Sequence, residues 1–313
     1  MRRSILAAIG AGIVAAIVAG VLMQASPAQN KPQAVLDQSH KIRIIASFYP
    51  LYEFSKNIAG DKADVSVFVP IGVEPHDWEP STGDVLELSK SDLFVYNGAG
   101  MEPFVEKLTD SDQYQNVSFV ETTQGIDLLA AQAGEEHLKY DPHVWLDPIL
   151  AKHQVTMIRD ALIKVDAGNT KYYTDNAAAY SAKLDALDSK IRDGLAHCNK
   201  DTFMPFHNAF SYFANRYGLH VFALSGIDPE SEATAADLKE FIDYVRENNI
   251  KVIFSEELID PKLANVLADE TGVQVLVFSP VEGLSHDDIA SGKTYIEKME
   301  ENLDHLKIAL ECQ

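Results

Sequence analysis

The chain has 313 residues, of which 46% are apolar and 23% are charged. It can therefore bury a full-sized core, and its length favours two domains over one. The formal net charge is −21, from 26 basic and 47 acidic residues. This balance argues against nucleic acid as a partner, because phosphate binding requires a clustered positive field, and it favours solubility and attraction of cations.

Residues 1–40 predict export from the cytoplasm. Arg2 and Arg3 precede an uncharged apolar run at residues 5–23, followed by small residues and a polar stretch. This order is typical of a secretory signal peptide. At about 1.5 Å per residue the run also approaches the ~30 Å hydrocarbon layer, so an uncleaved membrane anchor is the alternative. In both cases the rest of the chain lies outside the cytoplasm, because the arginines stay inside.

Cys198 and Cys312 are the two cysteines of the chain. Outside the cytoplasm they could form one disulfide between the chain end and the second half, and two buried thiols are the alternative. A zinc site at these residues is not expected, because neither lies in a CxxC or CxH motif.

Strand and helix patterns alternate from residue 41 onward. In the first half, strands are expected at 41–47, 64–70, 93–98 and 117–123, with helices near 49–59, 81–92 and 102–109. Ser81 is a suitable N-cap for the second of these helices. This βαβα order implies a parallel sheet covered by helices on both faces.

The pattern restarts after residue 200. Strands are expected at 202–207, 220–226, 252–257 and 273–280, and helices at 234–249 and 293–310. Between the halves, residues 170–198 carry apolar side chains every three or four positions: Tyr173, Ala177, Tyr180, Leu184, Leu187, Ile191 and Leu195. That period predicts a helix about 40 Å long, which would join the halves and limit hinge motion.

The expected fold is therefore α/β, with two lobes that each contain a mostly parallel sheet flanked by helices. Its expected divisions are residues 1–40 as signal or anchor plus linker, 41–168 as the first lobe, 169–199 as the linker helix and 200–313 as the second lobe.

Three of the ten histidines lie in stiff loops at the ends of predicted elements. His76 stands in EPHDWEPS after the second strand, and His143 stands in DPHVWLDP before a helix that Asp147 and Pro148 would start. His207 follows FMPF at the end of a strand. Ligands bind at the carboxyl ends of parallel strands, and a metal ligand needs a fixed direction. Together the three predict a metal site, although each alone could be a solvated or hydrogen-bonded side chain.

Carboxylates near these motifs are further candidates. Glu282 follows the strand at 273–280 and would supply a fourth ligand that offsets part of a divalent cation's charge, with an exposed loop glutamate as the alternative. Five other acids are candidate acceptors for imidazole N–H groups, or else ordinary surface acids: Glu74, Asp77, Glu79, Asp141 and Glu256.

Four segments occur in a recognisable order: IGVEPHDWEPS, DPHVWLDP, HNAFSYFANRYGL and SPVEGLS…GKTYIEKMEENLDHLKIAL. With them, residues 40–312 resemble the zinc- and manganese-binding solute receptors of ABC transporters, the ZnuA-like and TroA-like family. The resemblance implies metal ligation by four residues in the cleft between the lobes: His76, His143, His207 and Glu282. It also implies an extracytoplasmic receptor that delivers metal to a membrane permease driven by an ATPase.

The chain departs from zinc-type members of that family in the stretch before DPH. A long histidine-rich loop is often found there, whereas this chain has His137 with Glu135 and Glu136.

Three imidazoles and one carboxylate favour tetrahedral Zn(II) over Mn(II), which prefers more oxygen ligands and is the alternative cargo. A zinc-dependent hydrolase is the competing class. It would need an open coordination position, which Glu282 is expected to fill, and the sequence has no HExxH or nucleophile-elbow motif. The expectation is therefore a carrier rather than an enzyme, with an adhesin-like or metal-storage role as a third interpretation.

Overall fold

The computed structural model describes residues 41–76, 78–109, 111–131, 138–229 and 233–313, and these form one compact unit. The signal-or-anchor prediction, Asp77 and the His137 stretch lie outside the described residues. Within these ranges, no helix is long and apolar enough to cross a membrane.

Four parallel strands form the sheet of the first half. They are β1 (Ile42–Ala46), β2 (Ala63–Val67), β3 (Leu93–Tyr96) and β4 (Ser118–Glu121), in the spatial order β2-β1-β3-β4. Side chains alternate between two cores, as a pleated strand requires. Leu93 and Val95 on β3 face one apolar cluster, whereas Phe94 faces the other.

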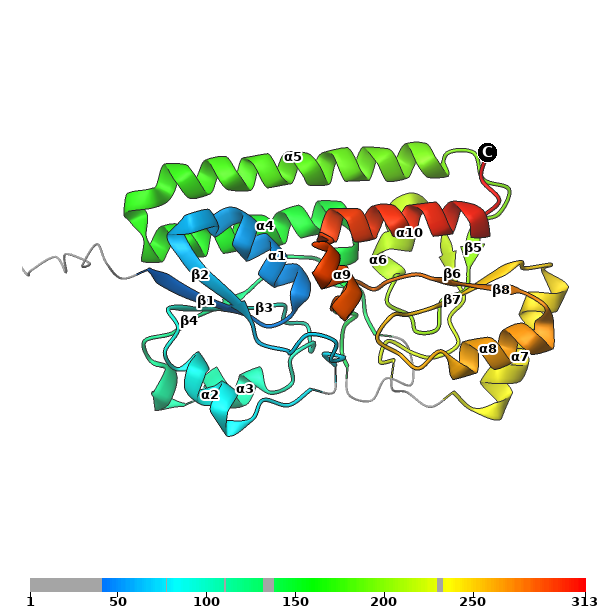
Figure 1. Cartoon of the computed structure of the whole chain (residues 1–313), viewed down its shortest axis with the longest axis horizontal. Helices are drawn as coiled ribbons and strands as arrows, with labels where there is room; N and C mark the ends of the chain where they lie inside the picture. Colours follow the sequence, from blue (N-terminus) through cyan, green and yellow to red (C-terminus); the bar gives the residue numbers. More distant parts are fainter. Residues whose placement is uncertain (1–40, 77, 110, 132–137, 230–232) are drawn as a thin grey trace, which may run out of the picture. The chain divides into compact units, whose positions relative to one another are not determined.

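Helices cover both faces of this sheet, as the βαβα order predicts (Figure 1). One face packs against α1 (Tyr49–Ala59) and α4 (Pro148–Val165). The other face packs against α2 (Thr82–Leu88) and α3 (Val105–Thr109). Ser81 caps α2 as predicted, because its side chain accepts a hydrogen bond from the backbone N–H of Asp84.

The second half contains two short parallel ladders. β5 (Thr202–Phe203) pairs with β6 (His220–Val221), and β7 (Val252–Ser255) pairs with β8 (Gln274–Val277). One backbone hydrogen bond, from Phe254 N to Met204 O at 2.9 Å, connects the two ladders. The strand expected at 202–207 is shorter than predicted, because Pro205 has no N–H to continue the pairing and the chain leaves the ladder toward His207.

In the described part of the second half, five α-helices accompany these ladders. They are α6 (Ser211–Tyr217), α7 (Ala235–Glu247), α8 (Lys262–Thr271), α9 (His286–Ser291) and α10 (Tyr295–Ala309).

The long helix α5 spans Thr170–Leu195 and lies along α1, α4 and α10 (Figure 1). Six of its seven predicted apolar positions are buried, and Leu195 at the last turn is partly buried. At about 1.5 Å per residue, its 26 residues span about 39 Å. Phe54 of α1 contacts Tyr180 of α5 at 5.6 Å and Tyr295 of α10 at 5.1 Å between ring centroids. The predicted linker helix therefore buries its apolar stripe in a core shared by both halves.

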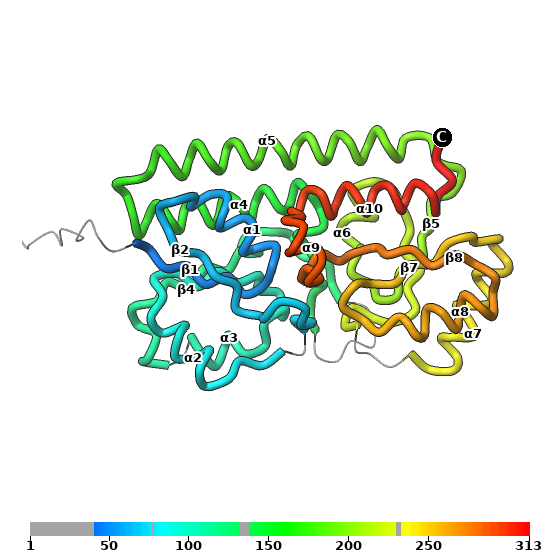
Figure 2. The backbone as a smooth tube through the Cα atoms, in the orientation of Figure 1, coloured from blue at the N-terminus to red at the C-terminus, as the bar shows by residue number. Residues whose placement is uncertain are grey.

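Cys198 and Cys312 form a disulfide. It joins the segment after α5 to the segment after α10, so these two neighbouring helices are tied at one end (Figure 2). The bond closes a loop with a sequence separation of 114 residues, so it removes many conformations from the unfolded chain.

Replacing both cysteines, as Cys198→Ser with Cys312→Ser, is expected to lower the free energy of unfolding by about 2–4 kcal/mol. Urea unfolding under non-reducing conditions measures this loss. The unsubstituted protein in reducing buffer serves as the control and should lose a similar amount. Equal stability of the double variant and the unsubstituted protein under non-reducing conditions would contradict the expectation.

Candidate metal centre

Four buried side chains from four separate loops converge at one point. His76 follows β2, His143 precedes α4, His207 follows β5 and Glu282 follows β8. Their exposed fractions are 9%, 0%, 0% and 4%, respectively. One ligand atom from each lies within 4.8 Å of the others. The structure therefore brings together the four residues that the sequence motifs single out.

The Nε2 atoms of all three imidazoles face the same carboxylate oxygen. Glu282 Oε1 lies 3.3 Å from His76 Nε2, 3.1 Å from His143 Nε2 and 3.8 Å from His207 Nε2. A tetrahedral Zn(II) ion with ligand bonds of 2.0–2.1 Å places its donor atoms about 3.3 Å apart. The distances from Glu282 Oε1 to the three Nε2 atoms therefore lie near the spacing that a tetrahedral ion imposes.

Two carboxylates hold the opposite side of the imidazole rings. Asp141 Oδ1 lies 2.8 Å from His143 Nδ1, and Glu256 Oε1 lies 2.6 Å from His207 Nδ1. An ionised carboxylate can only accept a hydrogen bond, so Nδ1 carries the proton. The neutral ring then presents the lone pair of Nε2 to the cluster, which is the tautomer that a metal ligand requires.

His76 is held differently. Glu74 accepts a hydrogen bond from the backbone N–H of His76, at 3.1 Å to Oε1 and 3.0 Å to Oε2. This contact fixes the main chain beside the ligand rather than its ring. Glu79 is exposed.

Burial and charge act in opposite directions on these groups. Burial lowers the pKa of His76, but the nearby Glu282 carboxylate outweighs it, so the pKa is raised overall. For His207, burial likewise lowers the pKa, yet Glu256 and Glu282 raise it well above its ordinary value. Burial raises the pKa of Glu282, but the three histidines hold it well below its ordinary range. The cluster therefore favours positive charge beside Glu282, from protons or from a cation.

His207 Nε2 carries a further sign of a metal site. This buried atom has no hydrogen-bond partner within the described part of the chain. Leaving a buried polar atom unsatisfied costs about 1–3 kcal/mol. A metal ion among the four donor atoms would satisfy it.

Contacts between the two halves fix the loops that carry the ligands. Trp145 Nε1 donates to Pro280 O at 2.7 Å, which links the His143 and Glu282 loops. Tyr212 Oη donates to Asp141 O at 2.8 Å, and Arg216 pairs with Asp147, the N-cap of α4, at 2.7 Å.

Asn97 adds support from within the first half, because its Nδ2 donates to Pro142 O at 2.9 Å. The roles of Tyr212, Arg216 and Asn97 could not be predicted from the sequence, because their partners are distant in the chain and no local spacing signals them.

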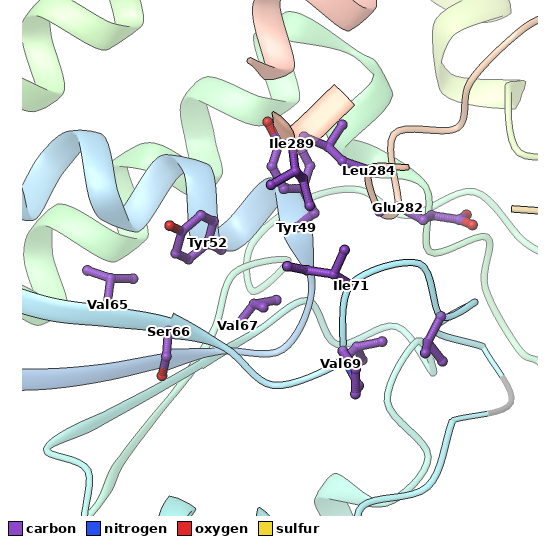
Figure 3. A pocket seen from close by; sticks show the side chains of 13 residues that line it. Tyr49, Tyr52, Val65, Ser66, Val67, Val69, Ile71, Glu282, Leu284 and Ile289 are labelled. Atoms are coloured by element: carbon purple, nitrogen blue, oxygen red, sulfur yellow. The ribbon is translucent and has the colours of Figure 1, made fainter. Parts of the chain in front are cut away.

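A cavity of about 340 Å³ lies beside Glu282, which forms part of its wall (Figure 3). Its walls come mainly from α1, β2 and the loop after it, and the α9 region, and they include Tyr49, Val67, Ile71 and Ile289. In Figure 3 the carboxylate of Glu282 points away from Tyr49 and Ile289. The cavity therefore adjoins the Glu282 loop, but its apolar walls contribute no further metal ligands.

Residues 44–309 match the family model described as zinc-uptake complex component A, periplasmic. The chain belongs to this family. Among relatives, the high-affinity zinc uptake system protein ZnuA of Bacillus subtilis is 39% identical over 280 residues, covering 86% of this chain and 88% of the relative. The zinc-binding lipoprotein AdcA of Streptococcus pneumoniae is 40% identical over 279 residues, and the matched region spans 55% of its length.

Solved structures agree with this membership. The Zn(II)-bound ZnuA-like domain of Streptococcus pneumoniae AdcA is 40% identical with a TM-score of 0.77, covering 87% of this chain and 100% of that domain. The laminin-binding protein Lmb of Streptococcus agalactiae, described as a bifunctional adhesin and metal transporter, is 34% identical with a TM-score of 0.79. It matches 87% of this chain and 100% of its own. The predicted two-lobe α/β fold with a long helix is thus confirmed.

Glu256→Ala is expected to weaken divalent-cation binding about 10- to 100-fold, because His207 loses the acceptor that sets its ring direction and tautomer. Competition titration against a chelating indicator measures the change. Glu247→Ala, which removes the same charge from an exposed position on α7, is the matched control and should bind as the unsubstituted protein does. Unchanged affinity in Glu256→Ala would show that Glu256 does not orient the ring.

Proposed function

We propose that this protein is an extracytoplasmic receptor that captures Zn(II) and delivers it to the membrane permease of an ATP-driven importer. The observation that carries the proposal is the buried cluster in which three imidazole Nε2 atoms face one oxygen of Glu282. Its membership in a zinc-uptake family supports the proposal. Zn(II) is here the transported cargo, with His76, His143, His207 and Glu282 as its ligands.

The donor set favours zinc over manganese. Three nitrogens and one oxygen suit Zn(II), whereas Mn(II) favours oxygen-rich sites with more ligands. In the described ranges, no fifth histidine, cysteine, aspartate or glutamate joins these four as a metal ligand. A manganese-preferring receptor would need one.

A carrier also fits better than a hydrolase. Catalytic zinc keeps an open position for water, with three protein ligands. Here a fourth side chain, Glu282, lies among the three histidines and is buried with them. The family model describes a component of an uptake complex, not an enzyme.

Delivery requires a membrane partner and a location outside the cytoplasm. The basic and apolar N-terminus supports export, and in this proposal residues 5–23 are a signal peptide or an anchor at the outer face of the cytoplasmic membrane. The first lobe (41–168) and the second lobe (200–313) would each supply two ligands, with the helix region 169–199 between them. A permease with its ATPase would receive the metal from this two-lobed body.

The purified protein should bind one Zn(II) per chain, and His207→Ala should lose most of the affinity. Elemental analysis and competition titration measure the two quantities. His220→Ala, at an exposed histidine, is the matched control and should retain full binding. Tight stoichiometric binding that survives in the triple variant His76→Ala, His143→Ala and His207→Ala would contradict the assignment of the metal ligands. Turnover of a simple ester above background would favour the hydrolase.

Zinc binding should weaken as the pH falls. In the metal-free protein the pKa values of His76 and His207 are raised, so these rings hold protons that the metal must displace. Each displaced proton lowers affinity about tenfold per pH unit below the relevant pKa. Titrations between about pH 8 and about pH 5.5 should show this slope. His207→Ala should have a shallower slope, and affinity independent of pH would contradict proton displacement.

A further inference from the structure

The loop that carries Glu282 has an unusual backbone. Val281 is fully buried and has a φ of +57°, a left-handed conformation that β-branched residues rarely adopt. Such a conformation is strained and persists only where surrounding contacts hold it. Because Val281 immediately precedes Glu282, the contacts that hold Val281 also set the direction of the Glu282 side chain.

Ser279 supports this loop through hydrogen bonds of both its backbone and its side chain. Its backbone N–H donates to Asn302 Oδ1 at 2.8 Å, and its carbonyl accepts from Asn302 Nδ2 at 2.7 Å. Its hydroxyl oxygen accepts from the backbone N–H of Val281 at 3.0 Å, and the hydroxyl donates to the carboxylate of Glu257. The strained residue is thus tied through one hydroxyl group to Glu257.

Glu257 in turn depends on a buried lysine. Lys298 of α10 is 4% exposed, and its Nζ lies 3.5 Å from Glu257 Oε1, 3.4 Å from Asp288 and 3.3 Å from Glu301. Asp288 and Glu301 also pair with Lys293, at 3.0 and 2.9 Å. Among the described ion pairs, Lys298 is the only cation that pairs with Glu257. Removing Lys298 would therefore leave Glu257, whose side chain is only 10% exposed, as an uncompensated buried charge.

Glu257 directly follows Glu256, which accepts the hydrogen bond from Nδ1 of a second ligand, His207. A shift of Glu257 would therefore act on His207 through the chain and on Glu282 through Ser279. Figure 1 shows α10 next to α9, the helix that carries Asp288.

We infer that Lys298 is a positioning residue of the metal site, acting through Glu257 and Ser279 on Glu282 and His207. It touches no metal ligand itself. This inference rests on the proposed zinc-binding function and adds a residue that lies outside the ligands and their direct hydrogen-bond partners.

Lys298→Met tests the inference, with Lys293→Met as the matched control. Lys293 pairs with the same two acids, Asp288 and Glu301, but has no described contact with Glu257. We expect Lys298→Met to weaken Zn(II) binding about 10- to 100-fold and Lys293→Met to change it less than about threefold. The visible d–d absorption of bound Co(II) should also change in Lys298→Met, because the ligands around the ion shift. A loss of stability alone would leave the ligand geometry, and therefore the spectrum, of the folded protein unaltered.

Ser279→Ala cuts the same connection without removing a charge, so it decides the matter if Lys298→Met does not fold. It should also weaken Zn(II) binding, while urea unfolding establishes that the variant is folded. Unchanged affinity in folded Lys298→Met or in Ser279→Ala, or equal weakening in Lys293→Met, would overturn the inference. Absence of Zn(II) binding by the unsubstituted protein would instead refute the proposed function.

Discussion

Burying a carboxylate among three imidazoles is the constraint on which the rest of this structure depends. Glu282 is taken out of water, where its charge is costly unless it is paired. Its Oε1 atom therefore lies close to the Nε2 atoms of His76, His143 and His207, where a proton or a metal cation can compensate its charge. Those imidazoles then need acceptors of their own, and the cluster is completed outward by carboxylates and by buried contacts between loops.

The supporting contacts explain why the site can be built from loops at all. Loops are ordinarily the least rigid parts of a fold. Here Trp145 joins the His143 and Glu282 loops, Arg216 joins α6 to the N-cap of α4, and Tyr295 Oη donates to Trp145 O at 2.5 Å. Together with α5, which packs against helices of both halves, these bonds oppose independent movement of the two halves. Zinc would therefore meet four ligand side chains that the fold already holds close together.

Local patterns predicted most elements, because their determinants are local. The apolar period of α5 needs only its own residues, and Ser81 and Asp147 cap helices through neighbours two or three positions away. The strand predicted at 202–207 is too long because its end does not depend on local sequence alone. Its end is set by where Pro205 interrupts pairing with a strand that lies elsewhere in the chain.

The sequence by itself determined the types of ligand and the stiffness of the loops that carry them, because proline and strand-end patterns are readable residue by residue. Only the tertiary structure decided which groups meet. His207 finds Glu256 at a separation of 49 residues, and His143 finds Glu282 at 139. Lys298 reads as one more charge on an amphipathic helix, yet it is buried against Glu257. Such pairings depend on how helices and ladders pack, and no spacing along the chain encodes them.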